Sequence, residues 1–274
     1  MELYAGKKIV ISKFCTSYAI THRGVVRQLN EDAHVEINSH NLWVVADGMG
    51  GHEAGEVASQ LVVDVIRTKV QELELDVLSI SHIVGAIEEA NRQLSEYSAS
   101  YLDNKTAGST VTALFLKDGN YHILWAGDSR AYLLRDGELQ QISRDHSQVN
   151  DLIDEGVISV EEAKNHPLSN VITRAVGVME NVKVDVIKDK IRTGDIFLLC
   201  SDGLTGELSD DDICMSLEPN SIIDSGMALM HSSLVRGARD NVTCILIKYD
   251  ETKDNQDINA INNMDEATIP LFTK

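Results

Sequence analysis

The sequence has few cysteines and no long apolar run, and each shortage excludes a class of protein. Its four cysteines are far apart and form no C-x-x-C pair, so neither a zinc knuckle nor a disulfide framework is indicated. We expect these cysteines to be buried thiols in a reducing cytoplasm. No stretch approaches the roughly 18 apolar residues of a membrane span, and the apolar part of the N-terminal segment is too short for a signal peptide.

Positive charge is also scarce: the chain has 24 Lys and Arg residues but 43 Asp and Glu residues, which gives a formal net charge of −19. Nucleic acids and anionic membranes are bound by clustered Lys and Arg, so we expect neither as a partner. The 274 residues are 43% hydrophobic, which is enough for a substantial core. This composition fits a soluble protein and is compatible with cation binding.

The hydrophobic pattern predicts mostly strands, with two helices early in the chain and two near its end. Residues 54–71 have apolar side chains at helical spacing, namely Val57, Leu61, Val65 and Ile66. Residues from about 79 to 97 have an apolar face made by Ile83, Ile87, Ala90 and Leu94, and helices are also expected near 209–217 and 221–235. The pairs Asp118-Gly119 and Asp136-Gly137 follow strand-like runs and predict hairpin turns. This order lacks the βαβ alternation of a parallel sheet. It predicts an α+β fold, a central β-sandwich of two mostly antiparallel sheets flanked by helix pairs.

The domain organisation is predicted from changes in this pattern. We expect one domain over residues 1–250, in which the polar segment from about 145 to 180 is an insertion, followed by a flexible acidic tail over 251–274. Thr268 in the tail lies between acidic and apolar residues, a setting that suits a kinase or a phosphothreonine-reading domain. We favour the simpler interpretation, an idle tail.

The stretch "VVADGMGGHEAGEVA" (44–58) is an apolar run that stops at Asp47 and is followed by four glycines in eight residues. The same pattern recurs, because Asp128 and Asp202 also come at the ends of strand-like runs and Asp240 opens the last one. Small residues adjoin three of them, in Asp47-Gly48, Gly127-Asp128 and Asp202-Gly203, and let backbone and ligand approach closely. Glu31 and Asp32 add two acids near the start.

Converging carboxylates repel one another unless a cation neutralises them. Oxygen ligands without thiolates favour Mg²⁺ or Mn²⁺, which usually retain water, and two such ions can activate a water for in-line attack at phosphorus. The simpler interpretation is that each Asp-Gly is only a turn, and for any single pair it is the more common one. The repeated pattern therefore indicates a candidate carboxylate metal site and nothing more specific.

Longer motifs carry a resemblance to a known family. They are "RGVVRQLNEDAH", "VVADGMGGHEAGEVAS", "GSTVTALFL", "WAGDSRAYLLRDGEL", "RDHSQVNDLIDEGVIS", "NVITRAVG", "LLCSDGLTGELSDDDI" and "RDNVTCILIKY". In type, order and spacing these motifs closely resemble the metal-dependent protein phosphatases of the type 2C (PPM) family in their bacterial form. They cover about residues 16 to 249. The resemblance implies the family's β-sandwich and identifies residues 145–180 as its flap, which we expect to shape protein-substrate choice.

The resemblance also implies a role for each matching residue. Asp47 would bridge two Mn²⁺ or Mg²⁺ ions, and Gly48 would contribute its backbone carbonyl to the second. Asp202 and Asp240 would bind the first ion, and Asp128 would bind a third ion together with Asp202. The remaining roles are those of Glu31 and Asp32, which would hold metal-bound water, and of Arg27, which would hold the phosphoryl group. A guanidinium suits that task because its planar fork pairs with two phosphate oxygens.

The sequence departs from the animal members of this family at one position. Met49 follows Asp-Gly where those members often have a histidine that is a proposed general acid, so the proton donor to the leaving group is open. Metal-bound water is the first candidate and His52 the second. A single histidine among glycines is more often a packing residue.

The resemblance implies a cytoplasmic bacterial Ser/Thr protein phosphatase. A hydroxide bridging two metal ions would hydrolyse phosphoserine and phosphothreonine on proteins, opposing a Ser/Thr kinase and acting on its substrates. Two alternatives stay open. One is a catalytically weak regulatory or binding module of the same fold, which a missing core aspartate would favour. The other is a phosphoesterase of nucleotides or small phosphates.

Overall fold

The computed structural model describes most of the chain between its two ends. The described residues are 10–11, 14–50, 54–103, 106–163, 166–168, 171–217 and 221–251. His52 and almost all of the predicted tail, including Thr268, lie outside these stretches.

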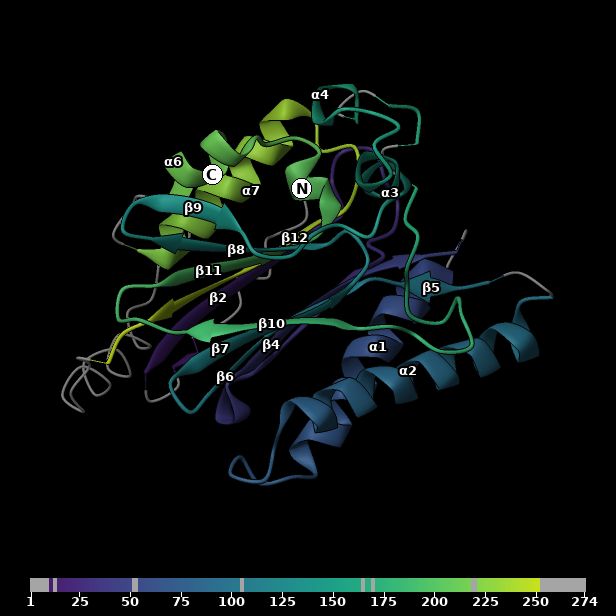
Figure 1. Ribbon diagram of the computed structural model, residues 1–274, viewed down its shortest axis with the longest axis horizontal. Helices are drawn as coiled ribbons and strands as arrows, with labels where there is room; N and C mark the ends of the chain where they lie inside the picture. The colour runs from purple at the N-terminus through teal and green to yellow at the C-terminus, as the bar shows by residue number, and fades with distance from the viewer. Residues whose placement is uncertain are drawn as a thin grey trace, which may run out of the picture.

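Two antiparallel sheets pack face to face and form the centre of the molecule (Figure 1). The first sheet has the strand order β1-β2-β12-β11-β8-β9. Its strands are β1 (Val10–Ile11), β2 (Cys15–His22), β8 (Arg130–Arg135), β9 (Glu138–Gln141), β11 (Ile196–Cys200) and β12 (Val242–Tyr249). The second sheet has the order β10-β7-β6-β4-β3, and β5 pairs with β4. Its strands are β3 (Asp32–Ile37), β4 (Leu42–Met49), β5 (Gly108–Ser109), β6 (Val111–Lys117), β7 (Asn120–Ala126) and β10 (Asp185–Lys190).

Helices cover the outer faces of both sheets (Figure 1). The second sheet is covered by α1 (Ala54–Gln71) and α2 (Ile80–Tyr101), and the first by α5 (Asp202–Thr205), α6 (Asp210–Leu217) and α7 (Ile222–Arg236). The flap lies between β9 and β10 and contains α3 (Gln148–Asp154) and α4 (Val160–Ala163). A 3₁₀ turn, η1 (Asn38–His40), connects β3 to β4.

The buried apolar side chains form three layers, and strand alternation decides which layer each residue joins. In β4, Leu42, Val44 and Ala46 pack against α1 and α2. Trp43 and Val45 point the other way, into the core between the sheets. Successive side chains of a strand face opposite sides, so a strand that is covered on both faces reads as a continuous apolar run. This explains why "LWVV" in β4 is apolar without alternation.

The structure confirms both early helices. Helix α1 begins and ends at the predicted residues, and all four apolar residues predicted to line one face of α2 are buried, namely Ile83, Ile87, Ala90 and Leu94. The buried face of α1 is shifted from the one we expected. Of the four predicted residues only Ile66 is fully buried, together with Ala58 and Val62, whereas Val57, Leu61 and Val65 are partly buried.

Both predicted hairpin turns are present. Asp118 and Gly119 have φ of 52° and 66°, and Asp136 and Gly137 have φ of 54° and 83°. Positive φ at both central residues is the requirement of a type I′ turn, which Asp-Gly pairs favour. These turns join β6 to β7 and β8 to β9.

Strand boundaries were predicted less well. The run "VKVDVIK" (182–188) predicts a strand, and the observed strand β10 begins later, at Asp185, which is the first residue that pairs with β7, opposite Trp125. Strand β3 was not predicted, although its apolar residues Ala33, Val35 and Ile37 alternate with polar ones and are buried. Strand β9 follows the predicted Asp136-Gly137 turn but has no buried side chain, and the short helix α5 had no signal in the hydrophobic pattern. The structure places them at sheet edges and at the end of β11.

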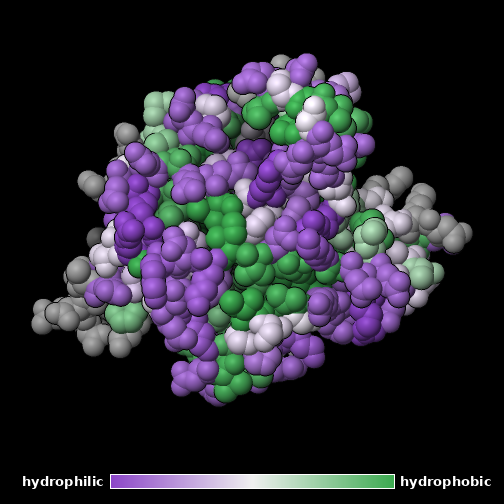
Figure 2. Space-filling view, in the orientation of Figure 1, coloured by the Kyte–Doolittle hydropathy of each residue, from purple (hydrophilic) through white to green (hydrophobic). Residues whose placement is uncertain are grey.

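The edge strand β10 is mostly exposed, although it includes Val186 and Ile187. Figure 2 shows hydrophilic residues over most of this face of the molecule, with an apolar area near its centre. Lys188, Asp189 and Lys190 follow on the same strand, and charges of this kind oppose pairing with another chain.

None of the described helices is long and apolar enough to cross a membrane.

We expect Ile66→Ala to lower the free energy of unfolding by about 2–5 kcal/mol, because it removes a fully buried side chain between α1 and the second sheet. Thr68→Ala is the matched control on the exposed face of α1 and should change the free energy by less than about 0.5 kcal/mol. Urea unfolding at equilibrium measures both. Equal effects of the two changes would contradict this packing of α1.

Candidate active site

The alternation that builds the inter-sheet core also directs acidic side chains into one end of it. In β4, Trp43 and Val45 lie between the sheets, and Asp47 continues the same side of the strand. Asp32, the first residue of β3, pairs with Asp47 across the two strands. The apolar layer between the sheets therefore ends in carboxylates rather than in further apolar side chains.

Asp32 is tied to the opposite sheet by a hydroxyl group. Ser201 Oγ, just after β11, donates a hydrogen bond of 2.7 Å to Asp32 Oδ2 and accepts one of 3.0 Å from the backbone N–H of Thr243. The other carboxylate oxygen of Asp32, Oδ1, is buried and has no hydrogen-bond partner among the described residues. Glu31 Oε1 is likewise buried and has no hydrogen-bond partner among the described residues.

Two further carboxylates come from the first sheet. Asp202 is the first residue of α5, directly after β11, and Asp240 lies two residues before β12. The two segments touch, because a Cβ at Gly203 would lie only 2.0 Å from the backbone oxygen of Asn241. A glycine after Asp202 is thus a packing requirement that brings Asp202 close to Asp240.

Close approach of two backbone segments also requires glycine at positions 48 and 55, beside Asp47. A Cβ at Gly48 would lie 1.9 Å from the backbone oxygen of Gly55. A Cβ at Gly55 would lie 2.3 Å from Glu31 Oε1 and 2.9 Å from the carbonyl oxygen of Gly48. The backbone carbonyl of Gly48 and the carboxylate of Glu31 therefore converge on a space that any side chain at position 55 would fill.

Asp128 is presented by a tight turn after β7. Its neighbour Ser129 is anchored at the start of β6: Thr110 Oγ1, one residue before this strand, bonds to Ser129 Oγ at 2.7 Å, and Thr112 Oγ1 donates to the backbone oxygen of Ser129 at 2.7 Å. Thr110 Oγ1 also accepts from the backbone N–H of Asp47 at 2.9 Å. One threonine thereby fixes the spacing between the segments that carry Asp47 and Asp128.

Arg27 reaches the site from the loop between β2 and β3. Its Nη2 lies 2.6 Å from Asp240 Oδ2, and its side chain remains 49% exposed. Asn241 holds this loop, because its Nδ2 donates to the backbone oxygens of Arg23 and Leu29 at 3.0 and 2.8 Å. The guanidinium thus lies at the mouth of the site, in contact with both carboxylate and solvent.

These groups surround a cavity of about 420 Å³. The predicted site residues that line it are Arg27, Glu31, Asp47, Gly48, Asp128, Asp202 and Asp240. Asp32 lies buried behind the cavity, and His52 lies outside the described residues, so its role stays a prediction. Met49 lines the cavity, as its place after Asp47-Gly48 requires.

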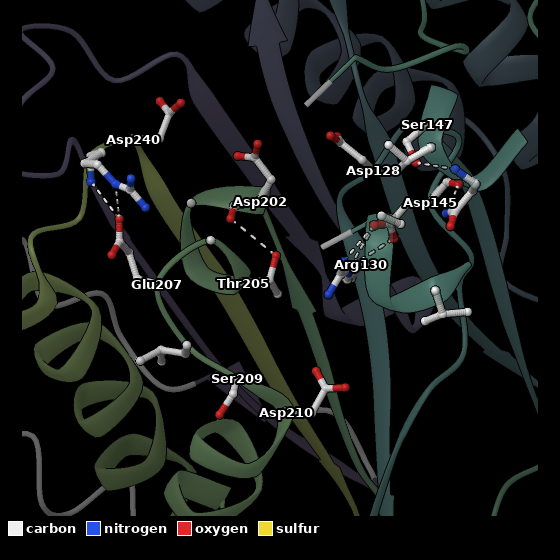
Figure 3. Close-up of a pocket in the computed structure, with 18 of the residues that line it drawn as sticks. Asp128, Arg130, Asp145, Ser147, Asp202, Thr205, Glu207, Ser209, Asp210 and Asp240 are labelled. Atoms are coloured by element: carbon white, nitrogen blue, oxygen red, sulfur yellow. Dashed lines mark hydrogen bonds and ion pairs between the residues drawn. The ribbon is translucent and has the colours of Figure 1, made fainter. Parts of the chain in front are cut away.

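A second, larger cavity of about 1040 Å³ adjoins the first and shares Asp128, Asp202 and Asp240 with it. Figure 3 shows these three aspartates along one edge. The walls come from the flap, through Ser147, Asn150, Ile153, Val160 and Ala163, and from the α5–α6 segment, through Gly203 and residues 205–210. The flap therefore stands directly beside the carboxylates.

Comparisons with known proteins agree with this arrangement. A family profile described as protein phosphatase 2C matches residues 21–234. The serine/threonine phosphatase stp of Listeria monocytogenes serotype 4b (strain F2365) is 36% identical over 245 residues, which are 86% of this chain and 97% of that protein. The chain belongs to the protein phosphatase 2C family.

Solved structures of this family share the fold. The crystal structure of the Mycobacterium tuberculosis serine/threonine phosphatase PstP/Ppp has a TM-score of 0.81 and 36% identity, over 86% of this chain and 99% of that one. The catalytic domain of the serine/threonine protein phosphatase PstP, solved in complex with two manganese ions, has a TM-score of 0.78 and 34% identity, over 86% and 99% of the two chains. The predicted sandwich of the phosphatase 2C family is thus confirmed.

The acidic cluster raises the pKa of its own members. Burial raises the pKa of Asp47 well above its ordinary value, and the charge of Asp32 adds to the effect. Burial likewise raises the pKa of Asp32 to about 7, and that of Asp128 to about 7 with a contribution from Asp202. For Asp202 the causes of the raised pKa are burial and then the charge of Asp240. The cluster thus resists full ionisation as long as no cation neutralises it.

The donor set fits hydrated divalent cations. Among the described residues, no group of three or more His, Cys, Asp or Glu side chains is arranged to hold a metal ion by itself. Mg²⁺ usually keeps several waters and takes only one or two carboxylates, so acids spread around a cavity suit it better than a closed cage would. Water on such an ion would donate to the orphaned oxygens of Glu31 and Asp32, so the residues present fit the ion.

Some residues that build the site were missed at the sequence level. Asn241, Thr110 and Ser201 bond across 63 to 210 positions of sequence, to Glu31, Asp47 and Asp32. Each does stand next to a predicted residue or inside a matching motif, in "RDNV", "GSTV" and "CSDG". Their position beside predicted residues or inside motifs could have indicated that they belong to the site, but it does not indicate which residue each one contacts.

We expect the metal-free protein to lose stability as the pH rises from about 4 to about 7. The folded protein keeps protons on Asp32 and Asp128 up to about pH 7, whereas the unfolded chain releases them near pH 4, so folding is disfavoured across this window. Asp128→Asn removes one of these groups. It should raise the melting temperature in EDTA at pH 7.5 and should have little effect at pH 4.

Thermal melts in EDTA at several pH values measure this difference, with the exposed Asp189→Asn as control for the loss of one negative charge. The difference between wild type and Asp128→Asn isolates the contribution of Asp128 from that of other titrating groups. A melting temperature of Asp128→Asn below that of wild type in EDTA at pH 7.5 would contradict the account.

Proposed function

We propose that this protein is a metal-dependent Ser/Thr protein phosphatase that uses Mn²⁺ or Mg²⁺ and acts in the bacterial cytoplasm. The observation that carries the proposal is the convergence of Asp47, Asp202, Asp240 and Asp128, each in or next to the end of a different strand, on one cavity with Arg27 at its mouth. The four cysteines are free thiols, which agrees with a reducing compartment.

The proposed roles follow the placement of the residues around the cavity. Asp47 and the carbonyl of Gly48 would hold two ions, with Asp202 and Asp240 completing the site of the first. Asp128, which shares the cavity with Asp202, would hold a third. Glu31 and Asp32, each with one orphaned buried oxygen, would accept hydrogen bonds from water on the ions.

Bound divalent cations supply the positive charge that offsets this cluster and activate water for attack at phosphorus. The protein groups bind and orient the substrate. A phosphoryl group carries negative charge and enters a site lined by carboxylates, so the guanidinium of Arg27 is the side chain suited to receive its oxygens. Arg27 is half exposed and contacts Asp240 through one nitrogen, so it has donors left for the phosphoryl group.

The substrates we propose are proteins phosphorylated on serine or threonine, the products of a Ser/Thr kinase. The cavity of about 1040 Å³ between the flap and the α5–α6 segment is far larger than one phosphoryl group and opens directly beside Asp128 and Asp202. A polypeptide segment around the phosphorylated residue would fill it, whereas a small phosphate ester would leave it empty. We therefore also propose that the flap contributes to protein-substrate choice.

The first test is release of phosphate from a phosphothreonine peptide with Mn²⁺, with Mg²⁺ and with EDTA. We expect activity that depends on the metal and falls by roughly 100-fold or more in Asp202→Asn, because a bound cation contributes several kcal/mol of transition-state stabilisation. Asp189→Asn on the exposed strand β10 is the control for charge. A folded wild type without activity under every metal condition would favour the regulatory-module alternative.

A second test addresses Arg27. Arg27→Ala should lower kcat/KM by roughly 10–100-fold, since a hydrogen bond to a charged group contributes about 1.5–3 kcal/mol. It should also weaken inhibition by inorganic phosphate, and Arg27→Lys should retain part of both, because it keeps the charge and loses the fork. The exposed Arg192→Ala is the matched control. Wild-type kinetics in Arg27→Ala would exclude Arg27 from phosphate binding.

A further inference from the structure

The turn that carries Asp128 is held by a residue far from it in sequence, His146 at the start of the flap. The backbone N–H of Gly127 donates to His146 Nδ1 at 3.1 Å, and the backbone N–H of His146 donates to the carbonyl of Gly127 at 2.9 Å. One residue thus satisfies both backbone polar groups of the residue before Asp128. His146 is itself only 8% exposed, so these bonds are shielded from water.

Gly127 has little freedom to move away from this clamp. Its φ of +119° is a conformation that L side chains rarely adopt, and a Cβ would lie 2.6 Å from Cγ2 of Thr110. On the other side of Asp128, Ser129 is bonded to Thr110 and Thr112. Asp128 therefore stands between an anchor in β6 and an anchor in the flap, and the flap anchor is His146.

The far side of the His146 ring contacts the end of the flap. Nε2 lies 3.1 Å from Asp185 Oδ2, and Arg174 Nη1 lies 2.9 Å from Nε2 and 2.9 Å from Asp185 Oδ1. The carbonyl of His146 accepts from the backbone N–H of Thr173 at 2.8 Å, and the ring stacks on Trp125 at 5.8 Å between centroids. His146 thus joins the start of the flap, the flap residues Thr173 and Arg174, and Asp185 at the start of β10 to the turn of Asp128.

The bonds decide which nitrogen of His146 carries the proton. The guanidinium of Arg174 can only donate, and its acceptor is Asp185 Oδ1 rather than Nε2. The backbone N–H of Gly127 can also only donate, so Nδ1 must offer its lone pair and Nε2 carries the hydrogen. The carboxylate of Asp185 accepts that hydrogen. Burial lowers the pKa of His146, which agrees with a neutral ring in this tautomer.

We propose that His146 is a positioning residue for Asp128. It fixes the Gly127–Ser129 turn through Nδ1 and, through Nε2 and its carbonyl, links the place of this carboxylate to the conformation of the flap. The proposal rests on the proposed role of Asp128 as a metal ligand. It predicts that the acceptor at the Nδ1 position matters for metal binding, whereas the polar group at the Nε2 position matters less.

Two amide substitutions test the roles of the two ring nitrogens of His146 separately. Asn at position 146 places an oxygen near the position of Nδ1 and keeps the acceptor for Gly127, whereas Gln places its amide near Nε2 and keeps only the contact with Asp185. His122→Asn is the matched control, because His122 is equally buried and bonds to Phe115, away from the turn. Circular dichroism melts establish that each variant is folded.

Isothermal titration with Mn²⁺ is the first measurement, and Asp128→Asn identifies the binding event that depends on Asp128. We expect His146→Gln and His146→Ala to weaken that event by about 10–100-fold, the usual effect of losing a partner that orients a metal ligand. His146→Asn and His122→Asn should stay within about threefold of wild type. Equal weakening in His146→Asn and His146→Gln would overturn the proposal, and so would the absence of any Asp128-dependent event.

The second measurement does not depend on metal or activity. Long-range ¹H–¹⁵N NMR of the histidine rings in the wild-type protein reports which ring nitrogen of His146 is protonated, with His146→Asn assigning the signal. We expect a neutral ring with hydrogen on Nε2. A hydrogen on Nδ1 would overturn the proposal even if the enzyme is fully active. Conversely, a wild type that binds Mn²⁺ as expected but releases no phosphate would count against the proposed function alone.

Discussion

The burial of several mutually repelling carboxylates at one end of the sandwich is the constraint on which the rest of the site depends. Asp32, Asp47, Asp128 and Asp202 each have a raised pKa, and burial is the largest cause in every case. Such a cluster lowers stability unless a cation neutralises it. The surrounding apolar layers must therefore be strong enough to hold the acids in place before the cation arrives.

The sandwich does this through ordinary strand geometry. The same face of β4 that buries Trp43 and Val45 presents Asp47, so the site is a continuation of the inter-sheet core. Glycines allow the close approach of neighbouring segments, at Gly48 against Gly55 and at Gly203 against Asn241. The candidate site residues thus lie at the ends of packed elements, where a rigid core fixes the backbone and a polar side chain can face the cavity.

Much of the fold could be predicted from local patterns. Helix α1 has the predicted bounds, and the two Asp-Gly turns form as expected, because periodicity and turn chemistry act over a few residues. Strand β9 could be placed only through the predicted Asp136-Gly137 turn, because none of its side chains is buried. Strand β3 was not predicted, since only Ala33, Val35 and Ile37 carry its alternating pattern. The contacts of Asn241, Thr110 and His146 were also missed, because hydrogen bonds between distant segments leave no pattern in the sequence. The local patterns indicated the acidic residues as a candidate metal site, whereas the role of each acid and the choice of Arg27 came from the resemblance to the family.

The central claim is that the cavity around Asp47 is a site for divalent cations. Crystals grown with Mn²⁺ and measured at the manganese absorption edge test it most directly, because anomalous scattering identifies the ion without reference to activity. We expect anomalous peaks in the cavity of about 420 Å³, beside Asp47, Asp202 and Asp240. No anomalous peak there, in crystals that hold Mn²⁺ at millimolar concentration and with the carboxylates in their present positions, would contradict the account.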